Sequence, residues 1–66
     1  MANKKLTTKD LEALSELMLL EDLAYKKANE YKSKFKDQEL KDQCEALAQS
    51  HKNKFTRLND YLSSHN

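Results

Sequence analysis

The stretch YKSKFKDQEL, residues Tyr31 to Leu40, decides the fold, because a helical pattern of apolar residues stops and restarts within it. Asp37 is a good N-cap for a second helix, and Glu39 follows in the first turn, where the helix dipole favours a carboxylate. Because the stretch contains no Gly or Pro, a single helix through residues 8–62 is the alternative. The break predicts a first helix at about 8–35, a turn at about 36–37 and a second helix at about 38–62.

Apolar residues recur at helical spacing on both sides of this stretch. Upstream, after a candidate cap at Thr7 or Thr8, the stripe consists of Leu11, Leu14, Met18, Glu21, Tyr25 and Ala28. Its adjoining flank consists of Leu17, Leu20, Ala24 and Tyr31, so the apolar face covers roughly half of the helix circumference. The downstream stripe is narrower, at about 100°, and consists of Leu40, Cys44, Leu47, His51, Phe55, Leu58 and Leu62.

The order of the charges favours a hairpin over the single long helix. Residues 9–22 hold five acids and one lysine, whereas residues 26–36 hold five lysines and one acid. The second helix repeats this order, with four acids and one lysine in residues 37–45 and three basic residues in 52–57. In an antiparallel hairpin each acidic half lies beside a basic half. Complementarity of each helix to its own dipole accounts for about half of the pattern.

A half-circumference apolar face is more than one neighbouring helix can cover. A 66-residue chain is a single domain with a small core, and oligomerisation is a common remedy. We therefore expect an all-α homodimer, in which two hairpins, each resembling half of a ferritin-like bundle, form a four-helix bundle. The expected dimer interface consists of Leu14, Leu17, Met18, Leu20, Ala24 and Tyr31. Leu19 and Leu23 lie on the opposite side of the first helix, where chance exposure and a further assembly contact are both open explanations.

Two polar residues, Glu21 and His51, interrupt the apolar stripes. They are equally far from Lys36 in sequence, so an antiparallel hairpin places them at the same height and facing each other. A buried carboxylate–imidazole pair that sets the register is the expected role, with the Tyr25 hydroxyl as a further donor. The alternative is a metal ion held by Glu21 and His51 of two chains. An intact di-iron site is not expected, because Ala48 stands where a Glu-x-x-His motif has its carboxylate.

The composition excludes several classes of function. Without Gly the chain has no phosphate-binding loop, and a single Cys44 rules out a disulfide framework. The longest apolar run, residues 17–20, is too short for a membrane span, and the net charge of +1 argues against nucleic-acid binding by bulk electrostatics. No acid, base and nucleophile share a helix face. We therefore expect a non-enzymatic cytoplasmic protein without a cofactor, a membrane partner or a nucleic-acid partner.

The residues on the helix faces resemble those of a known family. The first half of the pattern is Glu21 in a leucine-rich helix, Tyr25 one turn later and Ala28-Asn29-Glu30. The second half is Leu40, Leu47-Ala48, His51, Phe55 and the closing Asn59-Asp60-Tyr61-Leu62. Over residues 8–62 the chain resembles the small spore coat proteins of endospore-forming bacteria, the coat F-like group of ferritin-like helical proteins. This resemblance implies a structural component of the spore coat that contacts itself and other coat proteins. It also implies that Glu21 and His51 occupy carboxylate and histidine positions of a ferritin-like bundle.

A second resemblance is to the short helix-hairpin proteins of plasmid copy control, dimeric four-helix bundles that bind paired RNA loops. It rests on length, topology and the segment Cys44-Glu45-Ala46-Leu47. RNA binding would need basic, Asn and aromatic residues on the outer side of the first helix. Lys26, Asn29 and Lys36 lie near that surface without an aromatic residue, and Glu12 and Glu16 would repel phosphate. An RNA-binding dimer is therefore the alternative function.

Overall fold

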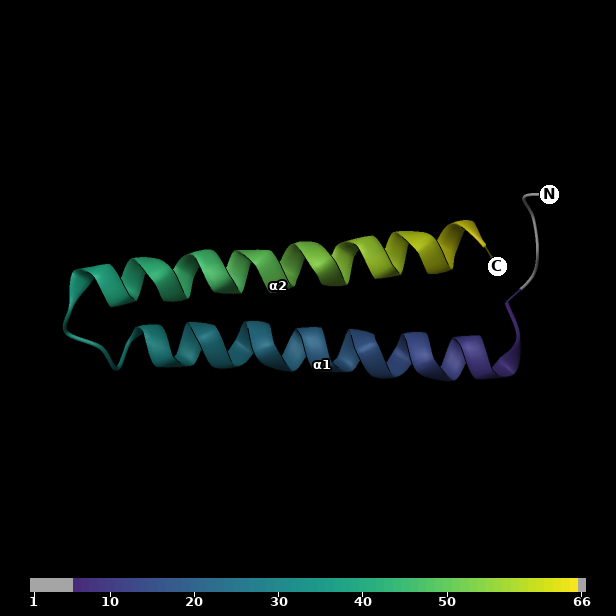
Figure 1. Ribbon diagram of the computed structural model, residues 1–66, viewed down its shortest axis with the longest axis horizontal. Helices are drawn as coiled ribbons and strands as arrows, with labels where there is room; N and C mark the ends of the chain where they lie inside the picture. The colour runs from purple at the N-terminus through teal and green to yellow at the C-terminus, as the bar shows by residue number, and fades with distance from the viewer. Residues whose placement is uncertain (1–5, 66) are drawn as a thin grey trace.

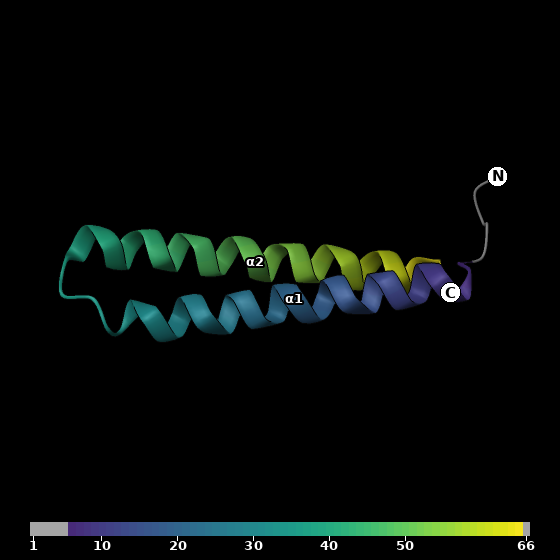
Figure 2. The same cartoon turned by 60° about the horizontal axis from the view of Figure 1, so that its bottom comes forward.

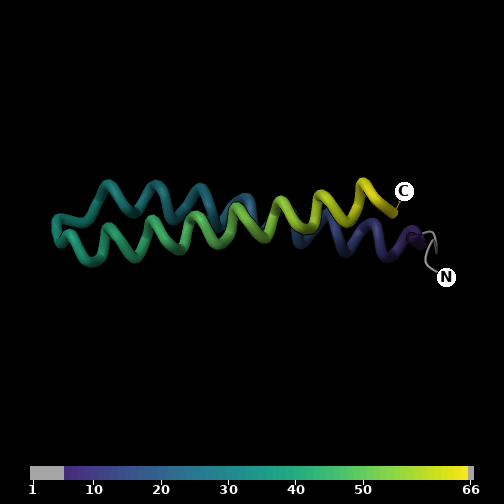
Figure 3. The backbone as a smooth tube through the Cα atoms, turned by 90° about the horizontal axis from the view of Figure 1, so that it is seen from above, coloured from purple at the N-terminus to yellow at the C-terminus, as the bar shows by residue number. Residues whose placement is uncertain are grey.

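The computed structural model describes residues 6–65, which form two helices and no strand: α1 (Thr8–Lys32) and α2 (Gln38–Ser64). The helices lie side by side and antiparallel, joined at one end by the loop of residues 33–37 (Figure 1). The views in Figures 1 and 2 show a layer one helix thick, and Figure 3 shows that the two helices cross at a shallow angle. The all-helical hairpin is confirmed.

Local side-chain hydrogen bonds explain where α1 begins. Thr7 is the N-cap, and its hydroxyl accepts a hydrogen bond of 3.0 Å from the backbone N–H of Asp10. The carboxylate of Asp10 in turn accepts one of 3.1 Å from the backbone N–H of Thr7. This reciprocal capping box satisfies two donors that an isolated helix end leaves free. Of the two candidate caps, the structure selects Thr7.

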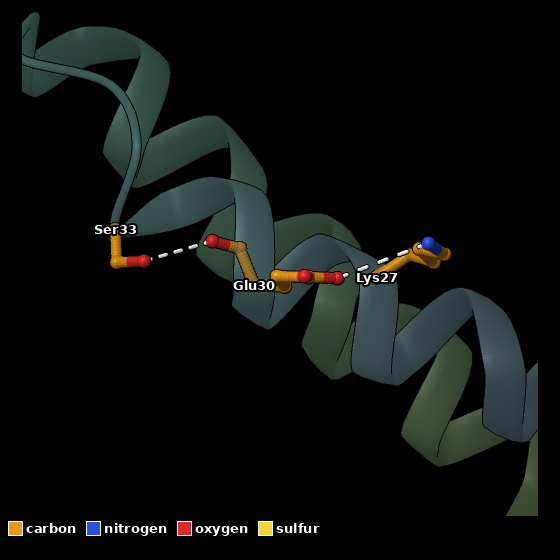
Figure 4. A network of polar contacts seen from close by, with 3 residues as sticks. All are labelled: Lys27, Glu30 and Ser33. Carbon is orange, nitrogen blue, oxygen red and sulfur yellow. Dashed lines mark hydrogen bonds and ion pairs between the residues drawn. The ribbon is translucent and has the colours of Figure 1, made fainter.

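The first helix ends at Lys32, earlier than the predicted end near residue 35. The hydroxyl of Ser33 donates a 2.8 Å hydrogen bond to the carbonyl of Glu30, whose carboxylate lies 3.9 Å from Lys27 Nζ (Figure 4). Asp37 has extended backbone angles, φ −71° and ψ 124°, and its carboxylate accepts a 2.8 Å hydrogen bond from the N–H of Glu39. The chain must leave the helical conformation to reach this cap, so the loop spans residues 33–37 and includes a half-buried Phe35.

The second helix begins at the predicted residue and ends at Ser64, slightly beyond the predicted end near 62. The hydroxyl of Ser64 donates a 3.1 Å hydrogen bond to the carbonyl of Tyr61. The ring of His65 stacks on that of Tyr61, with 3.8 Å between ring centroids. These contacts extend the helix by about half a turn.

The core between the helices is small. Of residues 6–65, only Ala28 and Ala48 are buried, with exposed fractions of 8% and 3%. Each is a small residue, so the two backbones can approach closely at these points. The larger members of the stripes, such as Met18 and Phe55, are half-buried. Leu40 and Leu47 belong to the predicted apolar stripe of the second helix, but both are exposed, at 41% and 53%.

The ordered charges form fewer contacts between the helices than the pattern predicts. Among residues 6–65, a single pair of lysine and carboxylate spans the two helices, Lys32 with Glu45 at 3.9 Å. The other lysine pairs lie within α1, where Lys26 contacts Asp22 at 2.9 Å and Lys27 contacts Glu30. Exposed pairs of this kind contribute about 0–1 kcal/mol, so they add little to the stability of the hairpin.

Candidate functional site

Glu21 of α1 and His51 of α2 contact each other across the hairpin, as their equal distances from Lys36 predict. His51 Nδ1 lies 2.5 Å from Glu21 Oε1, which makes this a hydrogen bond between groups 30 residues apart in sequence. Both side chains are 22% exposed, so the pair is half-buried. The sequence predicts a buried pair, and the structure differs from that prediction. The pair therefore joins the helices and also reaches the surface of the hairpin.

The surface beside this pair is a groove between the two helices. It has a volume of about 250 Å³ and is lined by Leu17 and Glu21 of α1 and by Lys54, Arg57 and Leu58 of α2. Two cationic side chains, Lys54 and Arg57, thus line the same groove as Glu21. The groove adjoins a second one, of about 440 Å³, which shares Leu17 and Leu58 and is otherwise mostly apolar.

The pair does not fit a metal centre within one chain. One ring nitrogen of His51 is already engaged by Glu21. Across residues 6–65, no three side chains of His, Cys, Asp or Glu gather closely enough to hold a metal ion. Ala48, one turn before His51, supplies no ligand. The arrangement is that of a carboxylate which orients an imidazole, without a nucleophile beside it in the described hydrogen-bond network.

The sequence predicts the Tyr25 hydroxyl as a further hydrogen-bond donor to Glu21. The structure shows no hydrogen bond from the Tyr25 hydroxyl to Glu21, and the Tyr25 ring instead lies 5.9 Å from Lys52 Nζ. Charge attraction between the ammonium and the ring face explains this position. Cys44 is half-buried and free.

Most of the large apolar side chains that are exposed in residues 6–65 lie on one side of the hairpin. Leu17 of α1 and Tyr61 of α2 line the same groove, which places them on that side. At 100° per residue, the others lie within about 60° of Leu17 or Tyr61 on their own helix. We call this surface the apolar face; it consists of Leu17, Leu20, Tyr31, Leu40, Leu47 and Tyr61. The Glu21–His51 pair opens toward it through the groove that contains Leu17.

The apolar face overlaps the predicted dimer interface only in part. Leu17, Leu20 and Tyr31 are exposed as that prediction requires. Leu14, Met18 and Ala24 are instead half-buried on the side of α1 that approaches α2. The predicted interface contains no residue of α2, although Leu40 and Leu47 are two helical turns apart and Tyr61 is four turns further along.

Neither α1 nor α2 contains a stretch long and apolar enough to cross a membrane. The expectations of a non-enzymatic and cytoplasmic protein stay predictions. Comparison of the chain with protein families, curated proteins and solved structures finds no match. The resemblance to the small spore coat proteins therefore also stays a prediction, carried by the residues on the helix faces.

Proposed function

We propose that the protein is a structural component that acts through protein–protein contacts, and that its working unit is a homodimer. Two hairpins pack with their apolar faces together and form a four-helix bundle. The observation that carries this proposal is the apolar face itself, because a single hairpin leaves its six large apolar side chains exposed to water. Contiguous exposed apolar surface of this kind is typical of interaction sites.

The surface area of the chain supports the same conclusion. One chain exposes 5400 Å². A compact monomer of 7.7 kDa would expose about 4,300 Å². The excess is comparable to the roughly 800 Å² that one partner buries in a stable interface of standard size. Among residues 6–65 of a single chain no large side chain is completely buried, so a second copy would supply most of the core.

The charges favour a second copy of this chain as the occupant. Residues 9–22 are mainly acidic and residues 26–36 mainly basic, so two α1 helices packed antiparallel place opposite charges side by side. Residues 37–45 and 52–57 give two antiparallel α2 helices the same property. A partner on the apolar face would also cover the half-buried Glu21–His51 pair and increase its desolvation.

Within this proposal the dimer is a building block of the spore coat or of a related sporulation structure. The support for that role is the resemblance over residues 8–62 to the coat F-like group. A protein whose largest exposed feature is a self-complementary apolar face suits a role in assembly.

The dimer is tested by light scattering after gel filtration. We expect about twice the chain mass of 7.7 kDa for the native sequence. Leu20→Glu should give a folded but monomeric chain, or a lower melting temperature that no longer depends on protein concentration. Asn53→Glu is the matched control, because it places the same charge on an exposed residue of α2 outside the apolar face. A native chain that elutes as a monomer at every concentration, or a Leu20→Glu variant that stays dimeric, would overturn the proposal.

The coat role has its own test. A fluorescent fusion expressed in a sporulating bacterium should collect at the forespore surface, and Leu20→Glu should make it diffuse. Uniform fluorescence of the native fusion throughout sporulation contradicts the coat role and leaves the dimer unaffected.

A further inference from the structure

A second exposed apolar surface lies on the side of α1 that faces away from α2. Leu19 and Leu23 are 69% and 53% exposed. Buried Ala28 marks the side of α1 that faces α2, and Leu19 and Leu23 lie about 180° and 140° around the helix from it. They are also about 100° from the centre of the α1 part of the apolar face. We call this surface the outer strip. It consists of Leu19 and Leu23 and of the charged residues that precede and follow them along the helix, Glu12, Glu16, Lys26 and Lys27.

A groove runs along the N-terminal half of the outer strip. It has a volume of about 530 Å³ and is lined by Thr8, Leu11, Glu12, Ser15, Glu16 and Leu19. None of these residues lines the grooves beside the apolar face. The groove is shallow and largely apolar, and the carboxylates Glu12 and Glu16 are part of its lining. It therefore suits an apolar side chain that is accompanied by a cation.

Further along the same helix, the outer strip carries an apolar side chain, Leu23, and a cation, Lys26. Glu16 lies three residues before Leu19, and Lys26 lies three residues after Leu23. Glu12 and Glu16 take part in no ion pair among residues 6–65, whereas Lys26 and Lys27 contact only exposed acids of their own helix. Such exposed pairs are weak, so these lysines can exchange partners at little cost.

We propose that the outer strip binds the outer strip of a second copy of this chain, with the two α1 helices antiparallel about a two-fold axis. The axis passes between Leu19 and Leu23. It places Leu19 against Leu23 of the second copy, and Glu16 beside Lys26 of the second copy. Because the contact is two-fold symmetric, each of these pairs occurs twice. Leu23 of the second copy packs against Leu19, and Glu16 in the groove lining meets Lys26 of the second copy.

This contact is separate from the proposed dimer and does not require it. Where both contacts form, a dimer carries two outer strips, one on each α1, and binds a further dimer through each. Dimers would then join into open chains. Four leucines make a patch well below the roughly 1,200 Å² of a stable specific interface, so the contact is weak and depends on salt.

Sedimentation velocity over a concentration series from micromolar to millimolar, at low salt, tests the outer strip. The weight-average mass of the native chain should rise beyond that of the low-concentration species and fall when salt is added. Glu16→Lys and Lys26→Glu should each suppress this rise, and the double variant should restore it, because exchanging both charges recreates the pair. Leu19→Glu should abolish the rise and leave the mass at low concentration unchanged.

The outcomes separate the two contacts. If the native chain is a monomer at low concentration but still associates in a Leu19-dependent way at high concentration, the proposed dimer is overturned and the outer-strip contact is retained. A mass that does not rise with concentration, or a double variant that associates no better than the single variants, overturns the outer-strip contact. Circular dichroism of each variant confirms that the helices remain folded.

Discussion

His51 is the central residue of α2, and its ring nitrogen contacts Glu21, which lies one residue from the centre of α1. The hydrogen bond therefore joins the helices at mid-length. Sliding α2 along α1 by one turn, about 5.4 Å, would break this contact and leave two partly desolvated polar groups without partners. The pair thus sets the register of a hairpin whose two buried alanines tolerate other alignments.

Replacing Glu21 tests the energy of this contact. Glu21→Gln keeps the shape of the side chain and removes its charge, and we expect the free energy of unfolding to fall by about 1–2 kcal/mol. The measurement is the urea midpoint at low protein concentration. Glu16→Gln, on the exposed side of the same helix, should stay within about 0.5 kcal/mol of the native chain. Equal midpoints for both variants would show that the contact adds no stability.

Ala48 is the most buried residue of the hairpin, and a larger side chain there should separate the helices. We expect Ala48→Leu to lower the free energy of unfolding by about 1–3 kcal/mol through overpacking. Ala46→Leu is the matched control, because residue 46 is exposed on the same helix. Thermal melts followed by circular dichroism distinguish the two. A stabilised Ala48→Leu variant would mean that the helices have room to spare at this point.

The two threonines Thr7 and Thr56 should respond in opposite ways to the same substitution. Thr7→Ala removes the N-cap of α1 and should cost about 1 kcal/mol. Thr56→Ala places a better helix former at an exposed position inside α2 and should be neutral or slightly stabilising. Helix content and the melting temperature report both effects. Identical losses at the two sites would contradict the role of the capping box.

Added metal should leave the stability of the chain unchanged, because Glu21 and His51 have no third His, Cys, Asp or Glu ligand close by within residues 6–65. A metal that binds the folded state at one hundred times its dissociation constant would add about 2.7 kcal/mol. The check is the melting temperature with Zn²⁺ or Fe²⁺ and again after chelation. A rise that chelation reverses and that His51→Ala removes would show that two chains together complete a metal site.

Features that depend on neighbouring residues in sequence were predictable. Asp37 is predictable as a cap, and Thr7 as one of two candidates with Thr8, because a short polar side chain before an apolar stripe bonds to backbone groups two or three residues away. The Glu21–His51 contact was predictable because an antiparallel hairpin relates residues at equal distances from its turn. These inferences require only helix geometry and the position of one break.

Features that depend on packing were not predictable in the same way. Phe35 continues the helical spacing of the first stripe, but the need to reach the Asp37 cap places it in the loop. Leu40 and Leu47 belong to the apolar stripe of the second helix but are exposed, whereas Ala48, which lies beside that stripe, is the most buried of residues 6–65. Apolar spacing identifies a face of a helix but not which edge of that face meets the neighbour.

The loop of residues 33–37 is also a site where a protease could cleave the chain. Lys34 and Lys36 are exposed there, so a trypsin-like protease has two cleavage sites outside the helices. In the described chain each helix is the other's only tertiary neighbour. One cut would turn the intramolecular pairing of α1 with α2 into the association of two separate peptides. Each helix would then lose the effective concentration, on the order of millimolar, at which the loop holds it near the other. Most of the stability of a helix in a protein comes from tertiary packing of its apolar face, so resistance to proteolysis depends on how well an assembly shields these few residues.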